Sequence, residues 1–375
     1  MKVFFLTNIP APYRIDFFNE LGKFCDLTVL FEKKNAMHRN DDWLSYDIKN
    51  FKAIFLNGMK IGKDAVFCSS ITKWIKKDKF DLFIVGGYST PTGMYAIELL
   101  KFKRIKFVLN CDGGFVKNDN FYVKNIKKHF IGSAYWWLSS GGVTNKYLEY
   151  YGAKKERIFE YPFTSVKKED IFKSPADEIE KKEIRKLLGI KGKKVVVSVG
   201  SFINRKGFDV LIKAWIKMPL DYELLIIGGG PEYLSLHKII SENSLNNVKL
   251  IDFKKKDELK KYYRSADLFV LPTREDIWGL VVNEAMAYGL PVITTNKCIA
   301  GLNLIENYKN GFITEVDDEY RLYLRIKELL DNDELIRNIS KNNLLKIQSY
   351  TIEEMAKKHK EIFNSIVKEK SDLYV

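Results

Sequence analysis

Two acidic residues with a glycine between them mark one segment in the second half of this 375-residue chain. Asp276 stands eight residues before Glu284, and Gly279 and Leu280 lie between them. The residues before Asp276 are apolar, and those around Glu284 have helical spacing until a Gly-Leu-Pro sequence. The pattern predicts a buried strand, a loop with Asp276 and a helix that carries Glu284.

A loop of this kind can hold a phosphorylated sugar. The first amides of a helix have no partner inside the helix, and the helix dipole is positive at that end. Gly279 would let a pyrophosphate approach the backbone closely. Glu284 can accept hydrogen bonds from two ribose hydroxyls, and Asp276 from hydroxyls of a sugar. The alternative is a plain helix N-terminus where the acids only favour the dipole.

The rest of the chain has the pattern of a scaffold for such loops. Short β-rich apolar runs alternate with amphipathic stretches in each half of the chain, which is typical of β-α-β units around a parallel sheet. A charged stretch after Val166 predicts a domain boundary there. The predicted strands cover residues 2–7, 26–31, 53–56, 82–85, 106–110, 140–143, 195–199, 222–227, 248–250, 268–271, 292–294 and 311–314.

The segment around Asp276 closely resembles the signature of the family-4 retaining glycosyltransferases of GT-B fold. That signature reads acid, two residues, Gly-Leu, then Glu-Ala-Met-Ala, and here Asp276, Gly279 and Glu284 occupy its positions. The resemblance implies an α/β chain with two Rossmann-like domains whose parallel sheets face a central cleft. It implies an acceptor-side domain over 1–165, a nucleotide-sugar-binding domain over 166–350, and a helix over 351–375 that can cross back to the first domain.

The same resemblance implies a reaction. The protein would transfer a sugar, as hexosyltransferases do, from a nucleotide-diphosphate sugar to a saccharide or polyprenyl-linked acceptor, with retention of configuration. It would need neither a metal nor another cofactor, and it would act in the synthesis of a bacterial surface polysaccharide. Glu284 would bind the ribose, Asp276 would face the donor sugar, and the backbone around Trp278, Gly279 and Leu280 would bind the donor phosphates.

A second loop begins after the strand predicted over 195–199. It resembles the Gly-Arg-Leu-x-x-x-Lys-Gly loop of the family, in which the Arg and Lys neutralise the leaving diphosphate. Gly200 and Lys206 match that loop, but Ser201 stands at the position of the Arg. We therefore expect Lys206 to be catalytic, and we hypothesise that Arg205 supplies the missing charge; the alternative for Arg205 is a surface residue. Phe253 lies in the segment that resembles the base-reading part of the family.

The first half has less regular motifs. Pro12, Tyr13 and Arg14 follow the first predicted strand and resemble a Pro-x-Pro-Tyr-Arg loop of some bacterial relatives. Arg14 could reach a phosphate or the acceptor, or it could stabilise local structure. Asp112 and Gly113 end another predicted strand, at a place where relatives often carry a histidine. Asp112 could orient the reacting sugar, or it could form an ordinary Asp-Gly turn.

Composition limits the partners. The chain has 62 Lys and Arg against 48 Asp and Glu, a net charge of +14 that favours anionic partners. The four cysteines and four histidines show no metal-ligand spacing, so we expect no metal site and a reducing, cytoplasmic location. The first apolar run is too short for a signal-peptide core, and no run reaches the roughly 20 residues of a membrane span.

One segment suggests contact with a membrane surface. Residues 121–138 are aromatic and basic without an acid, so they could lie in the headgroup region of an anionic bilayer. The alternative is a buried aromatic helix, which we favour for Trp136, Trp137 and Leu138. The expected location is therefore cytoplasmic and peripheral on the inner face of the membrane.

Two other functions fit parts of the sequence pattern. A sugar-nucleotide epimerase shares the GT-B architecture and would convert the donor without an acceptor. A nucleic-acid-binding protein would explain the positive charge. The chain carries none of the usual nucleic-acid motifs, so we expect no nucleic-acid partner.

Overall fold

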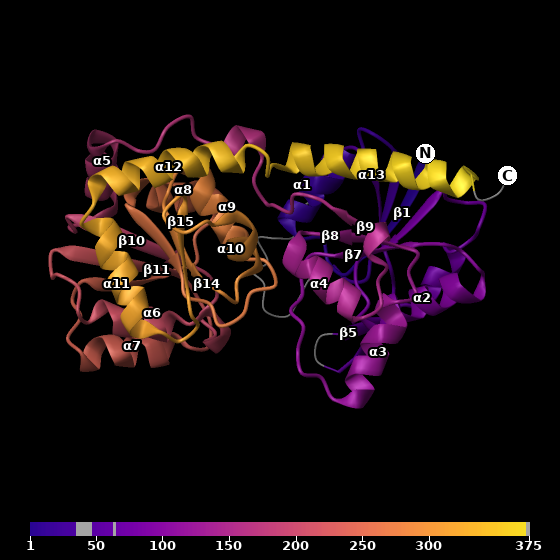
Figure 1. The fold of residues 1–375 in the computed structure, drawn as a ribbon, viewed down its shortest axis with the longest axis horizontal. Helices are drawn as coiled ribbons and strands as arrows, with labels where there is room; N and C mark the ends of the chain where they lie inside the picture. Colours follow the sequence, from indigo (N-terminus) through magenta and orange to yellow (C-terminus); the bar gives the residue numbers. More distant parts are fainter. Residues whose placement is uncertain (35–46, 63–64, 373–375) are drawn as a thin grey trace. The chain divides into compact units, whose positions relative to one another are not determined.

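The computed structural model describes residues 1–34, 47–62 and 65–372, which form two compact α/β units (Figure 1). The first unit contains Met1–Ser165 and the chain from Thr351 onward, and the second contains Val166–Tyr350. Each unit has its own parallel sheet with helices packed on it. Each unit also has its own hydrophobic core.

The described part of the first unit contains a seven-stranded parallel sheet. Its order, β3-β2-β1-β6-β7-β8-β9, puts the first strand in the interior, so the chain changes direction across the sheet between β1 and β6. The strands are β1 (Lys2–Thr7), β2 (Asp26–Phe31), β3 (Lys52–Phe55), β6 (Leu82–Val85), β7 (Val108–Cys111), β8 (Trp136–Ser139) and β9 (Ile158–Glu160). A separate antiparallel pair consists of β4 (Met59–Ile61) and β5 (Ala65–Phe67).

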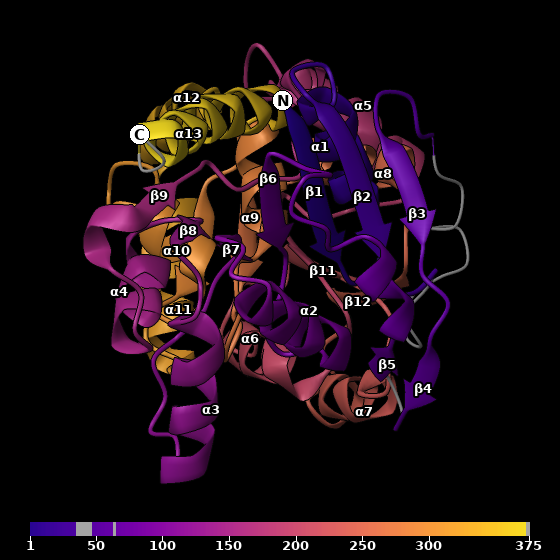
Figure 2. The same ribbon diagram turned by 90° about the vertical axis from the view of Figure 1, so that its right-hand side faces the viewer.

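Five described α-helices accompany this sheet, and Figure 2 shows them around its strands. They are α1 (Pro12–Leu21), α2 (Pro91–Phe102), α3 (Phe121–Ile131), α4 (Gly142–Tyr150) and α13 (Ile352–Asp372). Helix α13 packs along α1. Buried residues such as Met355 and Phe363 recur along it, as expected of a helix with one apolar face. The C-terminal helix therefore belongs to the same unit as the first strand.

The second unit repeats the arrangement. Its described strands are ordered β12-β11-β10-β13-β14-β15, so the change of direction falls between β10 and β13. The strands are β10 (Lys194–Val199), β11 (Tyr222–Gly228), β12 (Val248–Asp252), β13 (Leu268–Leu271), β14 (Val292–Thr295) and β15 (Gly311–Thr314). The helices are α5 (Glu178–Leu188), α6 (Phe208–Trp215), α7 (Tyr233–Glu242), α8 (Lys256–Ser265), α9 (Leu280–Ala287), α10 (Ile299–Leu304), α11 (Glu319–Leu330) and α12 (Asp333–Ile347).

One predicted strand is wrong. The sequence suggests a strand over 140–143, but the strand is β8, whose aromatic residues are fully buried between β7 and β9. Gly141 follows with φ 147°, and α4 begins at Gly142. The run of small residues after Ser139 therefore forms the turn, because the large aromatic side chains gain more from burial in the sheet.

Candidate functional site

Three predicted residues come together where the second sheet changes direction. The Lys206 Nζ donates a hydrogen bond to Asp276 Oδ2 at 2.5 Å. Arg205 Nη1 lies 3.6 Å from Asp276 Oδ1 and donates to the Glu275 carbonyl at 2.6 Å. The side chains of Lys206 and Asp276 are 13% and 12% exposed, whereas that of Arg205 is 45% exposed. The geometry thus gathers two cations around one largely buried carboxylate.

The fold places these residues at one sheet edge. Arg205 and Lys206 lie in the loop after β10, and Asp276 lies in the loop after β13, which is the neighbouring strand. Loops at such a change of direction separate from each other and leave the ligand crevice of an open α/β sheet between them. The two loops are also joined by backbone hydrogen bonds, since Arg274 N donates to the Arg205 carbonyl at 2.8 Å. The cations and the carboxylate are therefore held in register.

Residues 297–300 hold the other side of the Asp276 loop, and no sequence pattern predicts this contact. Asp276 N donates to the Lys297 carbonyl at 2.7 Å, and Ala300 N donates to the Trp278 carbonyl at 2.8 Å. The Cys298 thiol also donates to the Trp278 carbonyl, at 3.2 Å. Burial raises the pKa of this thiol to about 11, so it remains a neutral donor.

Gly279 has a structural role that the sequence did not reveal. Its φ of 102° lies in the left-handed region, and a Cβ there would meet Cys298 Sγ at 2.7 Å. Trp278 is 3% exposed, and its indole N–H donates to Asn283 Oδ1 at 2.8 Å. The Trp278 side chain thus supports the loop from inside, while Leu280 begins α9 with its first amides at the end of the loop.

Glu284 lies on α9 and is half-buried. It accepts a hydrogen bond from the Tyr263 hydroxyl at 3.3 Å. Tyr263 is buried and its ring stacks on Tyr288, with the centroids 5.0 Å apart. Burial, together with the charge of Glu284, raises the pKa of Tyr263 well above its ordinary value, so the hydroxyl keeps its proton. These tyrosines position Glu284. Because Tyr263 and Glu284 are 21 residues apart, no local sequence pattern predicts their hydrogen bond.

The other donor-side residues lie at the same edge of the second sheet. Gly200 follows β10, and a Cβ there would touch the Lys206 stem at 3.4 Å. Ser201 is exposed beside it. Phe253 follows β12 and is 46% exposed. The structure thus places all three after the carboxyl ends of strands, and their contacts with a nucleotide remain predictions.

In the first unit, two residues that the sequence analysis singled out in different segments, Arg14 and Asp112, are in contact. Arg14 is 4% exposed and forms an ion pair and hydrogen bond with Asp112. The Tyr161 hydroxyl donates to Asp112 Oδ1 at 2.8 Å, and Asn110 Nδ2 donates to the same oxygen at 2.9 Å. Burial opposes the charge of Arg14, but the Asp112 carboxylate outweighs it and raises the pKa of Arg14. Arg14 is thus fixed inside the unit instead of projecting from it.

The neighbours of this pair complete the edge of the first sheet. Pro12 occupies the first turn of α1, where its missing N–H costs nothing, and Tyr13 packs edge-on against Phe163 at 5.8 Å. The Gly113 carbonyl accepts a hydrogen bond from the Cys111 thiol at 3.5 Å. The Asp112 side chain is 27% exposed, so it is the charged group of the pair that can meet a ligand.

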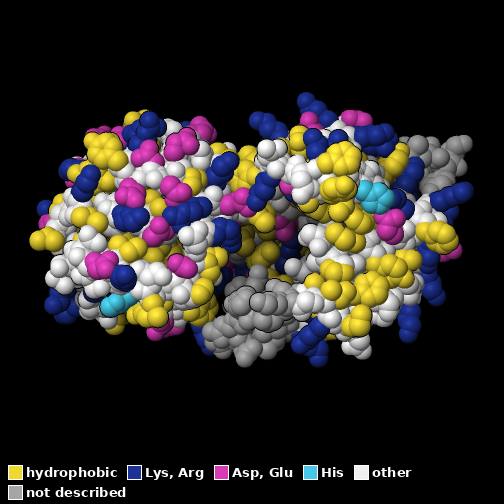
Figure 3. Space-filling model, turned by 90° about the horizontal axis from the view of Figure 1, so that it is seen from below, with side chains coloured by type: hydrophobic (Ala, Val, Ile, Leu, Met, Phe, Trp, Pro, Cys, Tyr) yellow, Lys and Arg dark blue, Asp and Glu magenta, His cyan; other side chains and the backbone are white. Residues whose placement is uncertain are grey.

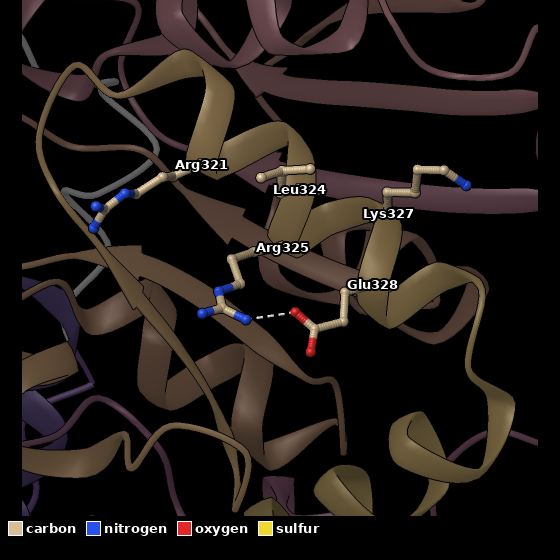
Figure 4. Close-up of a pocket in the computed structure, with 5 residues that line it drawn as sticks. All are labelled: Arg321, Leu324, Arg325, Lys327 and Glu328. Carbon is tan, nitrogen blue, oxygen red and sulfur yellow. Dashed lines mark hydrogen bonds and ion pairs between the residues drawn. The ribbon is translucent and has the colours of Figure 1, made fainter.

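A surface pocket lies on α11, away from these residues in the chain (Figure 4). It is lined by Arg321, Leu324, Arg325, Lys327 and Glu328. Arg325 donates to Glu328 at 2.5 Å, so the pocket's central charge is paired. The pocket includes none of the residues that the sequence singled out.

Among the residues that the structure describes, no three His, Cys, Asp or Glu side chains form a group that could hold a metal ion. Within the same part of the chain, every helix is too short or too polar to cross a lipid bilayer.

Comparisons with known proteins point to one family for the donor side. Residues 180–345, less than half of the chain, match the family model described as Glycosyl transferases group 1. An uncharacterized glycosyltransferase of Haemophilus influenzae is 32% identical over 177 residues, which cover 45% of this chain and 48% of that protein. The alpha-monoglucosyldiacylglycerol synthase of Acholeplasma laidlawii is 26% identical over 189 residues, which cover 49% of this chain and 47% of that protein. The chain thus spans about half the length of these relatives.

The likeness in fold extends over almost the whole chain. The crystal structure of HepE from Anabaena, in complex with UDP and glucose, has a TM-score of 0.77 and 16% identity. The alignment covers 97% of this chain and 100% of that one. The protein has the GT-B fold, with two α/β units built on parallel sheets, and this prediction from the sequence is confirmed.

Proposed function

We propose that this protein is a retaining glycosyltransferase that uses a nucleotide-diphosphate sugar as its donor. The observation that carries the proposal is the approach of Lys206 and Arg205 to Asp276, within the segment that matches the group 1 family. This arrangement has the charges that a sugar diphosphate requires, since two cations can face the phosphates while a carboxylate faces the sugar hydroxyls. Glu284, on the next helix, would then accept from the ribose hydroxyls.

The catalytic task of the cations is electrostatic. Negative charge grows on the diphosphate as the bond to the sugar breaks, so Lys206 and Arg205 stabilise the transition state more than the ground state. Before the donor arrives, Asp276 neutralises Lys206, which would otherwise be a largely buried, unpaired charge. In this proposal Lys206 and Arg205 perform the task without a metal ion, and Arg205 replaces the family Arg that is absent at Ser201.

The acceptor side of the proposal centres on the first unit. Asp112, held by Arg14, Tyr161 and Asn110, is a fixed carboxylate at the edge of the sheet and would orient the reacting sugar. The acceptor would be a saccharide or a lipid-linked saccharide used in building a bacterial surface polysaccharide. One relative is named for a glucosylated diacylglycerol, which supports an acceptor at a membrane. The enzyme would then work on the cytoplasmic side of that membrane.

The experiment is a thermal-shift screen of the purified protein against nucleoside diphosphates and nucleotide sugars, followed by an assay of donor consumption. A donor that raises the melting temperature is expected, because binding to the native state stabilises it. Released nucleoside diphosphate with an acceptor-dependent glycoside product, its anomer determined by NMR, supports retaining transfer. Conversion of the donor sugar without an acceptor would instead identify an epimerase. Failure of every nucleotide to stabilise the protein contradicts both.

A further inference from the structure

Helix α3 presents a row of apolar side chains to solvent. Phe121 is 74% exposed, Tyr122 78% and Ile126 50%. At about 100° per residue these three side chains lie within an arc of about 140° on the outward side of the helix, whereas Ile131 is fully buried. A contiguous apolar patch exposed on a soluble protein often marks a surface that binds a partner or a membrane.

The charges on α3 are all basic or neutral. The helix contains Lys124, Lys127 and Lys128 and no acidic residue. Lys127 is paired with Asp119 at 2.8 Å, and the Lys124 Nζ lies 4.5 Å from the centre of the Tyr150 ring. Asp119 is therefore already neutralised by a neighbour.

The second acid near α3 is likewise engaged. His129 approaches Glu98 of α2 at 2.6 Å, and Lys101 lies 3.3 Å from the same carboxylate. Lys101 also lies 3.1 Å from the His129 ring. Asp119 and Glu98 thus each have a basic partner, so neither leaves an unpaired negative charge beside α3.

Helix α3 begins on the side of the first unit where the carboxyl ends of the strands lie. It follows β7 through the loop that begins at Asp112, so Phe121 and Tyr122 come at the start of the crossover that leaves the carboxyl edge of the sheet. Both ribbon views show α3 extending away from the rest of the first unit (Figures 1 and 2). Seen from below, the first unit carries gathered hydrophobic side chains with Lys and Arg side chains near its margin (Figure 3).

We propose that α3 is the docking surface of this protein for an anionic lipid bilayer. Aromatic and aliphatic side chains can enter the headgroup region while the lysines meet anionic lipids, and an acid-free helix meets no repulsion there. The surface differs from the segment that the sequence suggested. Trp136–Ser139 form the buried strand β8, so the membrane face is confined to Phe121–Ile131.

Attachment to a bilayer through α3 would have a consequence for the proposed reaction. A bilayer bound at α3 would bring a lipid-linked acceptor toward the Asp112 edge of the first sheet. That consequence rests on the proposed transferase reaction, whereas binding of vesicles to α3 does not. The two can therefore fail separately.

The test is co-sedimentation of the full chain with vesicles of phosphatidylglycerol and phosphatidylcholine, compared with phosphatidylcholine alone, at low and high salt. We expect binding to the anionic vesicles that weakens with salt. The combined change of Phe121, Tyr122 and Ile126 to Ser should weaken the partition about tenfold or more, because three apolar side chains no longer leave water. The change of Lys124 and Lys128 to Glu should do the same.

Matched controls use equally exposed residues of the second unit. Ile179, Leu187 and Leu234 are 72%, 69% and 79% exposed, and their change to Ser should leave vesicle binding unaltered. Changing the exposed Lys182 and Lys186 of α5 to Glu controls for net charge. Thermal melts by circular dichroism check that every variant is folded. Absence of wild-type binding to anionic vesicles at low salt, or equal binding by the α3 variants and the controls, overturns the proposal.

Discussion

The ammonium of Lys206 donates a hydrogen bond to the carboxylate of Asp276 across 70 residues of sequence. The pair joins the loops after β10 and β13, which follow adjacent strands of the second sheet. Arg205 approaches the same carboxylate from a more exposed position. The two cations are thus already gathered around one carboxylate before any donor binds, and the first prediction follows from this geometry.

Replacing Lys206 with Ala should lower the turnover number by about two orders of magnitude, because it removes charge that stabilises the leaving diphosphate. Replacing Arg205 with Ala should also lower it, if Arg205 takes the place of the cation missing at Ser201. Steady-state kinetics with the donor found in the screen measures both. Lys213→Ala is the control, since this exposed lysine pairs with Glu319 on the surface at 3.3 Å. Full activity of both the Lys206 and Arg205 variants would mean that this loop does not bind the donor.

Replacing Glu284 with Ala should weaken donor binding by about 1.5 to 3 kcal/mol, the range for hydrogen bonds to a charged group. Isothermal titration calorimetry with the nucleoside diphosphate measures the change. Tyr263→Phe removes only the 3.3 Å hydrogen bond that positions Glu284, so its effect should be smaller. An unchanged Kd for the folded Glu284 variant contradicts the ribose assignment.

Replacing Arg14 with Ala should destabilise the protein by about 3 to 5 kcal/mol, because the Asp112 carboxylate would lose its buried partner. Urea unfolding followed by circular dichroism gives the free energy. Arg157, which lies 3.8 Å from Glu369 in the same unit, provides the comparison, and Arg157→Ala should cost less. A loss below about 1 kcal/mol for the Arg14 variant would show that the pair does not stabilise the unit.

His359 should make stability depend on pH. Burial lowers its pKa from 6.5 to about 4, so the native state keeps it neutral where the unfolded state is protonated. Its contribution is complete above about pH 6.5 and is lost as pH falls toward about 4. Glu32 acts in the opposite sense, because burial raises its pKa from 4.5 to about 7. The wild type should therefore be compared with His359→Gln, and the difference in unfolding free energy should shrink at acid pH.

A difference that stays constant between about pH 4 and pH 6.5 would contradict this titration. The reciprocal comparison uses Glu32→Gln. Relative to that variant, the wild type should lose stability as pH rises from about 4.5 to about 7, because the native carboxyl holds its proton longer than the unfolded one.

Local sequence patterns were enough to predict the alternation of strands and helices and the two loops of the donor side. These features depend on local patterns: apolar runs of strand length, helical spacing, and glycines at the ends of strands. The Asp276 loop, the helix with Glu284 and the loop with Lys206 therefore appear where the residues predicted them. Local patterns fail where composition is ambiguous. The sequence pattern did not distinguish the aromatic strand β8 from the basic helix α3 before it, because both lie in one aromatic segment.

Which side chains meet and which are exposed depends on how the whole chain folds. Arg14 and Asp112 are 98 residues apart, and Tyr263 and Glu284 lie on different helices, so no periodicity connects them. The structure buries Trp136 and exposes Phe121, although both belong to one aromatic segment. Burial depends on what packs against a side chain from elsewhere in the chain. The parallel sheets supply those neighbours, because they bring distant strands and their loops to one edge.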